Sequence, residues 1–425
     1  MNTFASDGDA PGKGVRRQDY AGWRRGLGRR RTRRCPLAVE FLEDRTVLSP
    51  TLFTVTSTGD SPGAPHTATS GDLRYCVGLA NANTNLAGSV VEFDPTVFAT
   101  PQTITLSPAL GTLEPTGSHG PEVISGPGAS LVTISGNNSV GVFHIPFNVG
   151  ASPITITGLT VTGGVAQRGG GVDNEGTLTL DSCTIADNTA ATTSSTFTDG
   201  GGGIYNSGSL VMHDDDLVAN AAIGSSPCGG AIFNANSIQA FRCNLVSNHA
   251  DAAKAHGGAV YNTGIFQVDD SIVRANVSGG DGGGIYSDDR LNVTSSTISE
   301  NTAQGTSSGG MYTSAWGDSG GGVFNGNAST ATLTDSTVTS NNAQCGGGLY
   351  NDGNMTLSNT TVAFNTVTGG DYIESGAGIL EDGGWPAAPA TLVTVGATIA
   401  YNKGPTVAGW GGGLDVVIMY LISGG

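Results

Sequence analysis

Three charged residues stand at equal spacing in the middle of the chain and could do chemistry together. Asp214, Arg242 and Asp270 are each 28 residues apart, and each lies six residues before an asparagine that closes a short strand-like segment. Neighbouring carboxylates can act as acid and base or bind Ca²⁺, and an arginine between them can stabilise negative charge. The spacing therefore predicts a candidate catalytic face, and an exposed ladder of alternating charge is the alternative interpretation.

Aromatic residues in longer inserted segments offer a second kind of candidate site. Trp316, Tyr372 and Trp410 lie in segments that separate one repeat from the next, with Asp318 and Asp371 close to the first two. An aromatic ring beside a carboxylate can stack on a sugar ring. These three aromatic residues are therefore candidate ligand-binding residues, although rings in such loops also pack on their own repeat.

The cysteines predict neither disulfides nor a metal site. Cys183 and Cys243 fall at one inward-facing position of the repeat, with Asp215 at that position between them. Two repeats stacked as parallel strands would put the two cysteines ~9.6 Å apart, beyond the ~7 Å that a disulfide spans. Cys228 and Cys345 likewise stand in equivalent positions several repeats apart. We expect free, mostly buried thiols and no bound metal, and a Cys183–Asp215–Cys243 site is the minor alternative.

No cofactor is expected from the motifs either. Gly279–Gly284 contains one Gly/Asp phrase similar to a Ca²⁺-binding nonapeptide, but that motif needs tandem copies. The glycine runs are not followed by Gly-Lys-Ser/Thr, so they are not phosphate-binding loops. Ca²⁺ therefore remains an alternative, and the primary expectation is a protein without a cofactor.

The candidate residues above are positioned by short strands that a sequence repeat predicts. A glycine phrase recurs from residue 169 onward, most clearly at Gly169–Asn174, Gly201–Asn206 and Gly346–Asn351. Its copies are roughly thirty residues apart, with variation typical of a solenoid that has loops of different length. After each phrase come a tight turn and two short alternating segments, the second of which ends in asparagine.

Equivalent positions of the repeats carry equivalent residues. The aliphatic residue after the glycines is Val172, Ile204, Ile232, Val260, Ile285, Val323, Leu349, Ile379 or Leu414. The closing residue is Asn188, Asn220, Asn248, Asn276, Asn301, Asn341, Asn365 or Asn402. Stacked asparagines can bond to one another from repeat to repeat and satisfy buried polar groups. The pattern predicts an all-β fold, a single-stranded right-handed parallel β-helix with one long, thin core.

Composition excludes several classes of protein. The 425 residues include 68 Gly without a Gly-X-Y period, so the chain is not collagen-like. No segment approaches the roughly 18 apolar residues of a membrane span. Residues 46–425 carry 7 Lys and Arg against 29 Asp and Glu, a net charge of −22. A body this acidic repels nucleic acid, so nucleic acid is not an expected partner.

The chain divides into three parts. Residues 1–49 form a basic and disordered head with an export or targeting role, because they hold eleven of the eighteen Lys and Arg. Residues 50–168 are expected to form an N-terminal cap and the first irregular rungs of the helix. Residues 169–425 form the regular repeats, with an atypical end at 414–422 where we expect the repeat pattern to stop.

The repeats resemble those of a known group of bacterial surface proteins. The glycine–aliphatic phrases, together with the asparagines that close the strands, are similar to polymorphic outer-membrane-protein repeats. Upstream, Phe53–Asp60, Gly71–Arg74 and Val91–Pro95 resemble the CSLREA-type segment that precedes such β-helices, although Tyr75–Val77 departs from its usual Glu-Ala-Ile. The resemblance implies a β-helix of pectin lyase-like fold with a surface or adhesin-like role.

The head carries a second resemblance. The segment from Leu37 to Ser49 follows an arginine cluster and resembles the LEPR/LEDR region of exported planctomycete-type proteins. That resemblance implies export to the cell surface, to an outer-membrane-associated location or to the extracellular space.

These observations favour a structural, adhesive or ligand-binding protein without catalysis, whose partners are polysaccharides or other cell-surface ligands. The alternative is a pectate-lyase-like polysaccharide lyase or a glycoside hydrolase that uses the Asp214, Arg242 and Asp270 face. A β-helix can carry either role, so the fold does not decide between them. Against the enzyme, basic residues are scarce in the body, whereas a lyase of anionic polysaccharide needs a basic groove or firm Ca²⁺ ligands.

Overall fold

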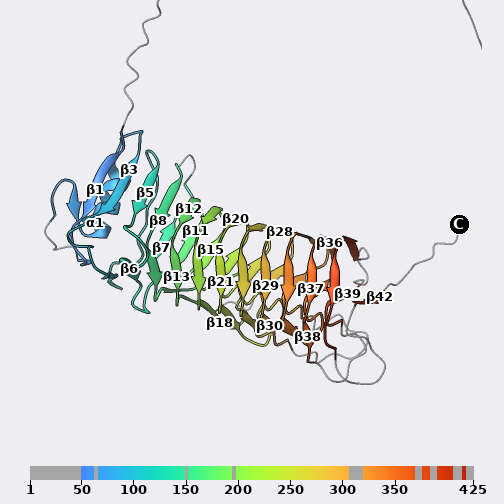
Figure 1. Ribbon diagram of the computed structural model, residues 1–425. Coiled ribbons are helices and arrows are strands. Elements are labelled where there is room, and N and C mark those ends of the chain that lie inside the picture. The colour runs from blue at the N-terminus through green and yellow to red at the C-terminus, as the bar shows by residue number, and fades with distance from the viewer. Residues whose placement is uncertain are drawn as a thin grey trace, which may run out of the picture. The chain divides into compact units, whose positions relative to one another are not determined.

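The chain winds into a parallel β-solenoid in which successive rungs stack one behind the other (Figure 1). The computed structural model describes residues 49–61, 66–148, 152–193, 198–305, 319–368, 376–382, 390–404 and 414–417. In these ranges, all strand pairs are parallel, and one short helix lies near the N-terminal end. The all-β, parallel β-helix prediction is confirmed.

Each regular rung gives one strand to each of four sheets, in the order C, A, B, D along the chain. Sheet A stacks β2 (Ser70–Gly71), β1 (Thr51–Val55), β3 (Ser89–Phe93), β5 (Glu122–Ser125), β8 (Ile154–Thr157), β12 (Thr177–Asp181), β16 (Ser209–His213), β20 (Ser237–Phe241), β24 (Ile265–Asp269), β28 (Arg290–Thr294), β32 (Thr330–Thr334), β36 (Asn354–Ser358) and β40 (Thr391–Val395). Sheet B stacks β4 (Gln102–Thr105), β6 (Val132–Ser135), β9 (Thr160–Thr162), β13 (Thr184–Ala186), β17 (Asp216–Val218), β21 (Asn244–Val246), β25 (Ile272–Arg274), β29 (Thr297–Ser299), β33 (Thr337–Thr339), β37 (Thr361–Ala363) and β41 (Thr398–Ala400).

The other two sheets complete the circuit. Sheet C stacks β7 (Phe143–Ile145), β11 (Val172–Asn174), β15 (Ile204–Asn206), β19 (Ile232–Asn234), β23 (Val260–Asn262), β27 (Ile285–Ser287), β31 (Val323–Asn325), β35 (Leu349–Asn351), β39 (Ile379–Asp382) and β42 (Leu414–Val417). Sheet D stacks β10 (Val165–Ala166), β14 (Thr189–Thr192), β18 (Ala221–Gly224), β22 (His249–Asp251), β26 (Val277–Ser278), β30 (Thr302–Ala303), β34 (Asn342–Ala343) and β38 (Thr366–Val367).

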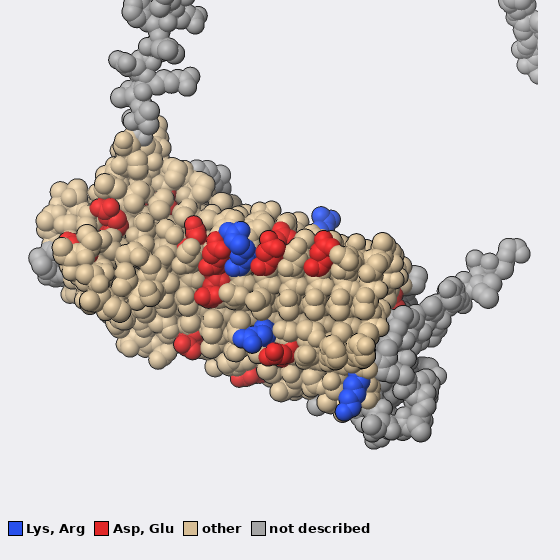
Figure 2. All heavy atoms as spheres, in the orientation of Figure 1, with Lys and Arg blue, Asp and Glu red and all other residues tan. Residues whose placement is uncertain are grey.

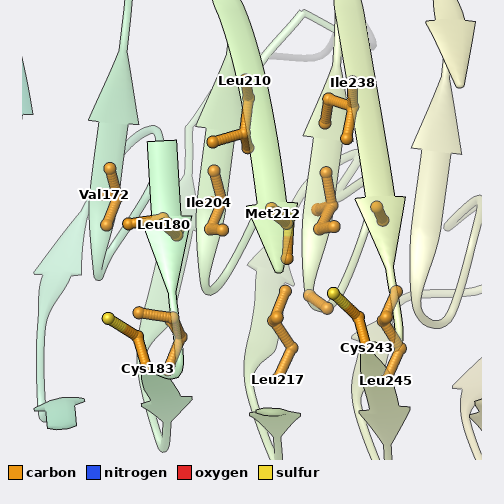
Figure 3. Close-up of a cluster of buried hydrophobic side chains, with 14 of the residues drawn as sticks. Val172, Leu180, Cys183, Ile204, Leu210, Met212, Leu217, Ile238, Cys243 and Leu245 are labelled. Atoms are coloured by element: carbon orange, nitrogen blue, oxygen red, sulfur yellow. The ribbon is translucent and has the colours of Figure 1, made fainter. Parts of the chain in front are cut away.

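The core is one continuous column of aliphatic side chains inside the coil. Strand residues alternate inward and outward, so like residues meet on neighbouring rungs. Val172 pairs with Ile204, and the register continues through the predicted aliphatic column to Leu414. Figure 3 shows Leu217 inside the rung that lies between those of Cys183 and Cys243. The columns read from the sequence are therefore confirmed.

The closing asparagines form the expected ladder. Asn276 shows the pattern: its side-chain amide donates to Asn301 Oδ1 at 2.9 Å, and its own Oδ1 accepts from the side chain of Asn248 at 3.0 Å. Backbone N–H groups donate to the same carbonyl oxygens, as from Asn248 to Asn276 at 2.9 Å. The ladder runs from Asn188 to Asn402, and all its members are buried or nearly so.

The N-terminal end of the core holds the one described helix, α1 (Leu73–Ala82), which the repeat pattern did not predict. Asp72 caps it by accepting the backbone N–H of Tyr75 at 2.8 Å, and its apolar side joins the core. Arg74 reaches from the helix to Asp60 with two hydrogen bonds, at 2.7 and 3.0 Å, and also donates to the carbonyl of Thr112. Arg74 therefore ties helix α1 to the preceding segment and to the first rungs.

Two further expectations can be compared with the described residues. Leu414–Val417 pair with β39 and so extend sheet C, as expected for the aliphatic column that ends at Leu414. The described cysteines form no disulfide, and four are buried: Cys76, Cys183, Cys228 and Cys243. Cys345 is partly exposed. The expectation of thiols outside disulfides is confirmed for these five, and Cys35 lies outside the described residues.

The surface carries few charges, as the composition requires. Figure 2 shows one face on which scattered acidic and basic side chains interrupt a mostly uncharged surface. Among the residues that the structure describes, no helix has the length and hydropathy to cross a membrane.

Candidate functional site

A stack of aromatic rings runs along the outside of sheet C and ends beside a cavity. We call this stack the aromatic spine, and it consists of Tyr205, Phe233, Tyr261, Tyr286, Phe324 and Tyr350. Consecutive ring centroids lie 4.6 to 5.2 Å apart, and all the rings except Tyr286 are buried. Each ring follows the aliphatic residue of its rung, so the spine is a second apolar column parallel to the core.

The spine stops at the rungs that precede Tyr205. On the two preceding rungs, the position equivalent to Tyr205 is held by Asp173 in β11 and by His144 in β7. These two residues are paired neighbours in sheet C. The guanidinium of Arg168 lies 4.7 Å from the centroid of the Tyr205 ring and covers its end. A charged cluster therefore replaces aromatic rings at this point of the column.

Beside this cluster lies a cavity of about 350 Å³. The following residues line it: Thr112, Gly141, Phe143, His144, Ala166, Arg168, Gly169, Asp173 and Glu175. Asp173 and Glu175 flank the inward-facing Asn174, so both point outward from the same stretch of backbone. The volume lies at the lower end of the range for small-molecule sites, about 300–1,000 Å³.

The polar groups in the cavity contact one another loosely. Arg168 Nη2 lies 3.3 Å from Glu175 Oε1 and 3.8 Å from Asp173 Oδ2. The His144 ring lies 3.5 Å from Glu114 through Nδ1 and 3.9 Å from Glu175 through Nε2. Arg168 therefore donates a hydrogen bond to Glu175, and the other contacts are longer than ordinary hydrogen bonds.

Asp173 is the least satisfied member of the cluster. Its side chain is 19% exposed, and its buried Oδ1 has no hydrogen-bond partner among the described residues. Burial raises the pKa of Asp173 above its ordinary value, although Arg168 and His144 oppose that shift. A buried carboxylate oxygen without a donor is costly, so Asp173 is poorly satisfied within this cluster.

The sequence contains one signal for this site, although none of the candidate residues predicted from the repeat belongs to it. The residue after each aliphatic is aromatic on six rungs, and Asp173 breaks that series at its N-terminal end. The break marks the rung where the spine stops. His144 and Glu114 belong to earlier, irregular rungs whose register could not be read from the sequence, so the cluster itself could not be assembled from spacing.

The predicted catalytic face lies elsewhere, at the corner between sheets A and B. Asp214, Arg242 and Asp270 occupy equivalent exposed positions on three successive rungs, as expected. Arg242 donates from Nε and Nη2 to the two carboxylate oxygens of Asp214, at 2.7 and 2.8 Å. This bond holds the pKa of Asp214 below its ordinary value.

The geometry of this face matches the alternative interpretation, an exposed charge ladder. The side chains of Arg242 and Asp214 are 55% and 47% exposed, and they already satisfy each other. A general acid or base needs a pKa shifted toward neutral pH, whereas the shift at Asp214 goes the other way. Asp270 is exposed on the next rung.

At Cys183, Asp215 and Cys243, the minor alternative for a metal site, Asp215 makes ordinary structural contacts. Asp215 lies between the two cysteines as predicted, and its carboxylate accepts the backbone N–H groups of Cys183 and His213 at 2.8 and 3.1 Å. Burial raises the pKa of Cys183 and of Cys243 to about 12, so both thiols are protonated in the metal-free protein.

The remaining candidates are three aromatic residues and one aspartate. Trp316, Tyr372 and Trp410 lie outside the described residues. Asp281, from the glycine-rich segment similar to a Ca²⁺-binding phrase, has Oδ2 3.3 Å from His256 Nδ1. That carboxylate therefore already has a partner within the protein.

Comparisons with known proteins identify no family. The sequence matches no family model, and no curated protein matches it. Among solved structures, a chain described as "Geobacillus virus E2 - ORF18" is similar over 80% of this chain, with 10% identity and a TM-score of 0.33. The aligned part covers 57% of that chain, so this protein spans little more than half its length. A similarity at this level carries no information about function.

Proposed function

We propose that this chain is an exported β-helix protein of the cell surface or extracellular space that binds a ligand without turnover. The cavity at the end of the aromatic spine carries the proposal. It is a concave site with an arginine, a histidine, two carboxylates and a buried oxygen that lacks a described donor. Concavity with a few converging polar groups is typical of a binding site.

A saccharide is the ligand class that suits the lining best. The carboxylates of Asp173 and Glu175 can accept hydrogen bonds from hydroxyl groups of a saccharide. A volume of about 350 Å³ accommodates one sugar unit or the end of a chain. Export rests on the resemblance of the head to planctomycete-type export regions, and a surface role rests on the resemblance to polymorphic outer-membrane-protein repeats.

The second candidate function is a polysaccharide lyase or glycoside hydrolase acting on the corner between sheets A and B. The observation in its favour is the placement of Asp214, Arg242 and Asp270 on three consecutive rungs. The exposed bidentate ion pair between the first two weighs against it, because a guanidinium bound to a carboxylate is not free to bind substrate.

A single panel experiment tests both functions. The full chain is incubated with immobilised polysaccharides, with and without Ca²⁺, and both retention and new chain ends are measured. We expect retention on at least one polysaccharide and no new chain ends. Asp173→Asn should weaken retention about tenfold, the effect of roughly 1.4 kcal/mol, because it removes a charged acceptor from the cavity.

Matched variants separate the outcomes. Glu300→Gln removes an exposed carboxylate on a distant rung and should leave retention unchanged. New chain ends that disappear in Asp214→Asn would replace the binding proposal with the enzyme. Absence of retention on the whole panel, or retention insensitive to Asp173→Asn, would contradict the cavity as a saccharide site.

A further inference from the structure

We propose that His144, Asp173 and Glu175 form a binding site for a divalent transition-metal ion, with Zn²⁺ as the best match. The inference rests on the proposed function in one respect, because both require the cavity to be a ligand site. The inference goes further than the proposed function because it names an ion. The ion would be bound by side chains that line the cavity, with one coordination position open toward the cavity.

The positions of the three side chains suit a metal ion. Each offers one ligand atom, and the three atoms lie within 4.8 Å of one another. Ligand atoms bound to Zn²⁺ at about 2.0–2.2 Å lie roughly 3–4 Å apart, so small side-chain rotations would close the site. The backbone is fixed, because His144 and Asp173 are paired in sheet C and Glu175 follows two residues later.

The donor set selects the kind of ion. An imidazole nitrogen with two carboxylate oxygens suits Zn²⁺, whereas Ca²⁺ takes six to eight oxygen ligands. Three protein ligands leave a fourth position for water or for a hydroxyl of a bound molecule. The cavity of about 350 Å³ provides the space for that fourth ligand.

Glu114 would act as a positioning residue for the imidazole. Its Oε1 lies 3.5 Å from His144 Nδ1, while His144 Nε2 faces Glu175 at 3.9 Å. A proton held on Nδ1 by a carboxylate leaves the lone pair of Nε2 free for a metal ion. The histidine is thus oriented with its ligand nitrogen toward the other two members.

Arg168 supplies a feature by which the proposal can be tested. Its Nη2 lies 3.3 Å from Glu175 and 3.8 Å from Asp173, so the guanidinium now supplies the positive charge beside these two carboxylates. A metal ion must compete with the guanidinium for these carboxylates. The guanidinium also lies 4.7 Å from the centroid of the Tyr205 ring, and this cation–π contact can hold it when a metal ion takes its place beside the carboxylates. Removing Arg168 should therefore strengthen metal binding, whereas it would weaken binding of an anionic ligand.

The test is a Zn²⁺ titration of the full chain by calorimetry after treatment with EDTA, without any saccharide. We expect one equivalent to bind at the cavity, and His144→Gln and Asp173→Asn should each weaken it at least tenfold. Arg168→Met should tighten it several-fold. His249→Gln is the matched control, because His249 also lies beside an aspartate, Asp251 at 3.5 Å, but on sheet D.

Cobalt absorption identifies the ligands. Co²⁺ bound to one histidine and two carboxylates gives weak visible bands without the strong thiolate charge-transfer band that cysteine ligands produce. Circular dichroism and thermal unfolding without metal check that each variant is folded, and Glu175→Gln replaces any variant that is not.

Three outcomes would overturn the metal site: Zn²⁺ affinity unchanged in His144→Gln and Asp173→Asn, a cobalt spectrum with thiolate bands, or weaker binding in Arg168→Met. Saccharide retention measured separately in EDTA distinguishes this failure from that of the proposed function. Zinc binding without retention would uphold the metal site alone, and retention without zinc binding would overturn the metal site alone.

Discussion

At the scale of single residues, backbone conformation explains the equally spaced charges. The corner between sheets A and B has positive φ on each regular rung, with values of 56° at Asp214, 54° at Arg242 and 50° at Asp270. Glycine, asparagine and aspartate tolerate this left-handed conformation best. The equal spacing of Asp214 and Asp270 is therefore a property of the corner, and Arg242 is the unusual residue there.

Asp215 is a second residue whose identity reflects its place in a column. The same column holds serines on later rungs, where Ser271 Oγ accepts the backbone N–H of Cys243 at 2.9 Å. Asp215 does the same for Cys183 with a carboxylate oxygen. It is fully buried, and burial raises its pKa to about 8 even though two backbone N–H groups donate to it.

This raised pKa predicts how stability depends on pH. Between about pH 4 and pH 8, the folded state keeps a proton on Asp215 that the unfolded state has lost, so stability must fall as pH rises. Asp215→Ser, which copies the later rungs, should remove that part of the fall. It should stabilise the protein at pH 8 by roughly 1–3 kcal/mol, the cost of a poorly compensated buried polar group.

Urea unfolding at pH 5 and pH 8 measures the effect of Asp215→Ser. The gain in stability should be larger at pH 8 than at pH 5. Ser271→Ala, in the same column but without an ionisable group, is the control and should cost about the same at both values. Parallel changes for Asp215→Ser at the two pH values would show that Asp215 keeps an ordinary pKa.

At the scale of elements, ladders join each strand to the next rung. The asparagine ladder uses every polar atom of the amide: Asn276 accepts two hydrogen bonds from Asn248 and donates to Asn301 and to the carbonyl of Leu245. These bonds lie in the interior, where unpaired amides are costly. The ladder therefore stabilises the corner between sheets B and D.

Replacement of one asparagine should depend on its place in the ladder. Asn276→Ala leaves several buried groups without partners, at roughly 1–3 kcal/mol for each. Asn402→Ala removes a residue that is 9% exposed, and water can replace part of its bonds. Denaturant unfolding should therefore show a much larger loss for Asn276→Ala. Equal losses would indicate that the ladder contributes no more in the middle than at this rung.

Strands that recur in each rung could be predicted from the sequence, whereas helix α1, which occurs once, could not. The strands around Val172 and Ile204 could be predicted because residues of the same type recur at the same position of each rung. A chance match at one rung would not recur at the others. Helix α1 occurs once, contains Gly78, and lies where no repeat guides the reading. Its N-cap, Asp72, was present in the sequence but is a weak signal without a periodic apolar pattern behind it.

At the scale of the whole molecule, the site lies where irregular rungs give way to regular ones. His144 and Glu114 come from rungs before the glycine phrases begin, and Asp173 comes from the first regular rung. The regular part can be predicted from the sequence because its rungs resemble one another. A site built across the boundary depends on the registration of unlike rungs, which only the fold reveals.

The elongated core also implies that stability is local. Each rung packs on its neighbours, so a defect should loosen nearby rungs more than distant ones. Leu245 is fully buried in sheet B near the middle of the solenoid, and Leu245→Ala should cost about 2–5 kcal/mol. Hydrogen exchange should accelerate in β21 and in the adjoining β17 and β25, and protection in helix α1 should stay unchanged. The conservative change Leu245→Met is the control and should alter exchange little. Uniform acceleration along the chain, α1 included, would show instead that the solenoid unfolds as one cooperative unit.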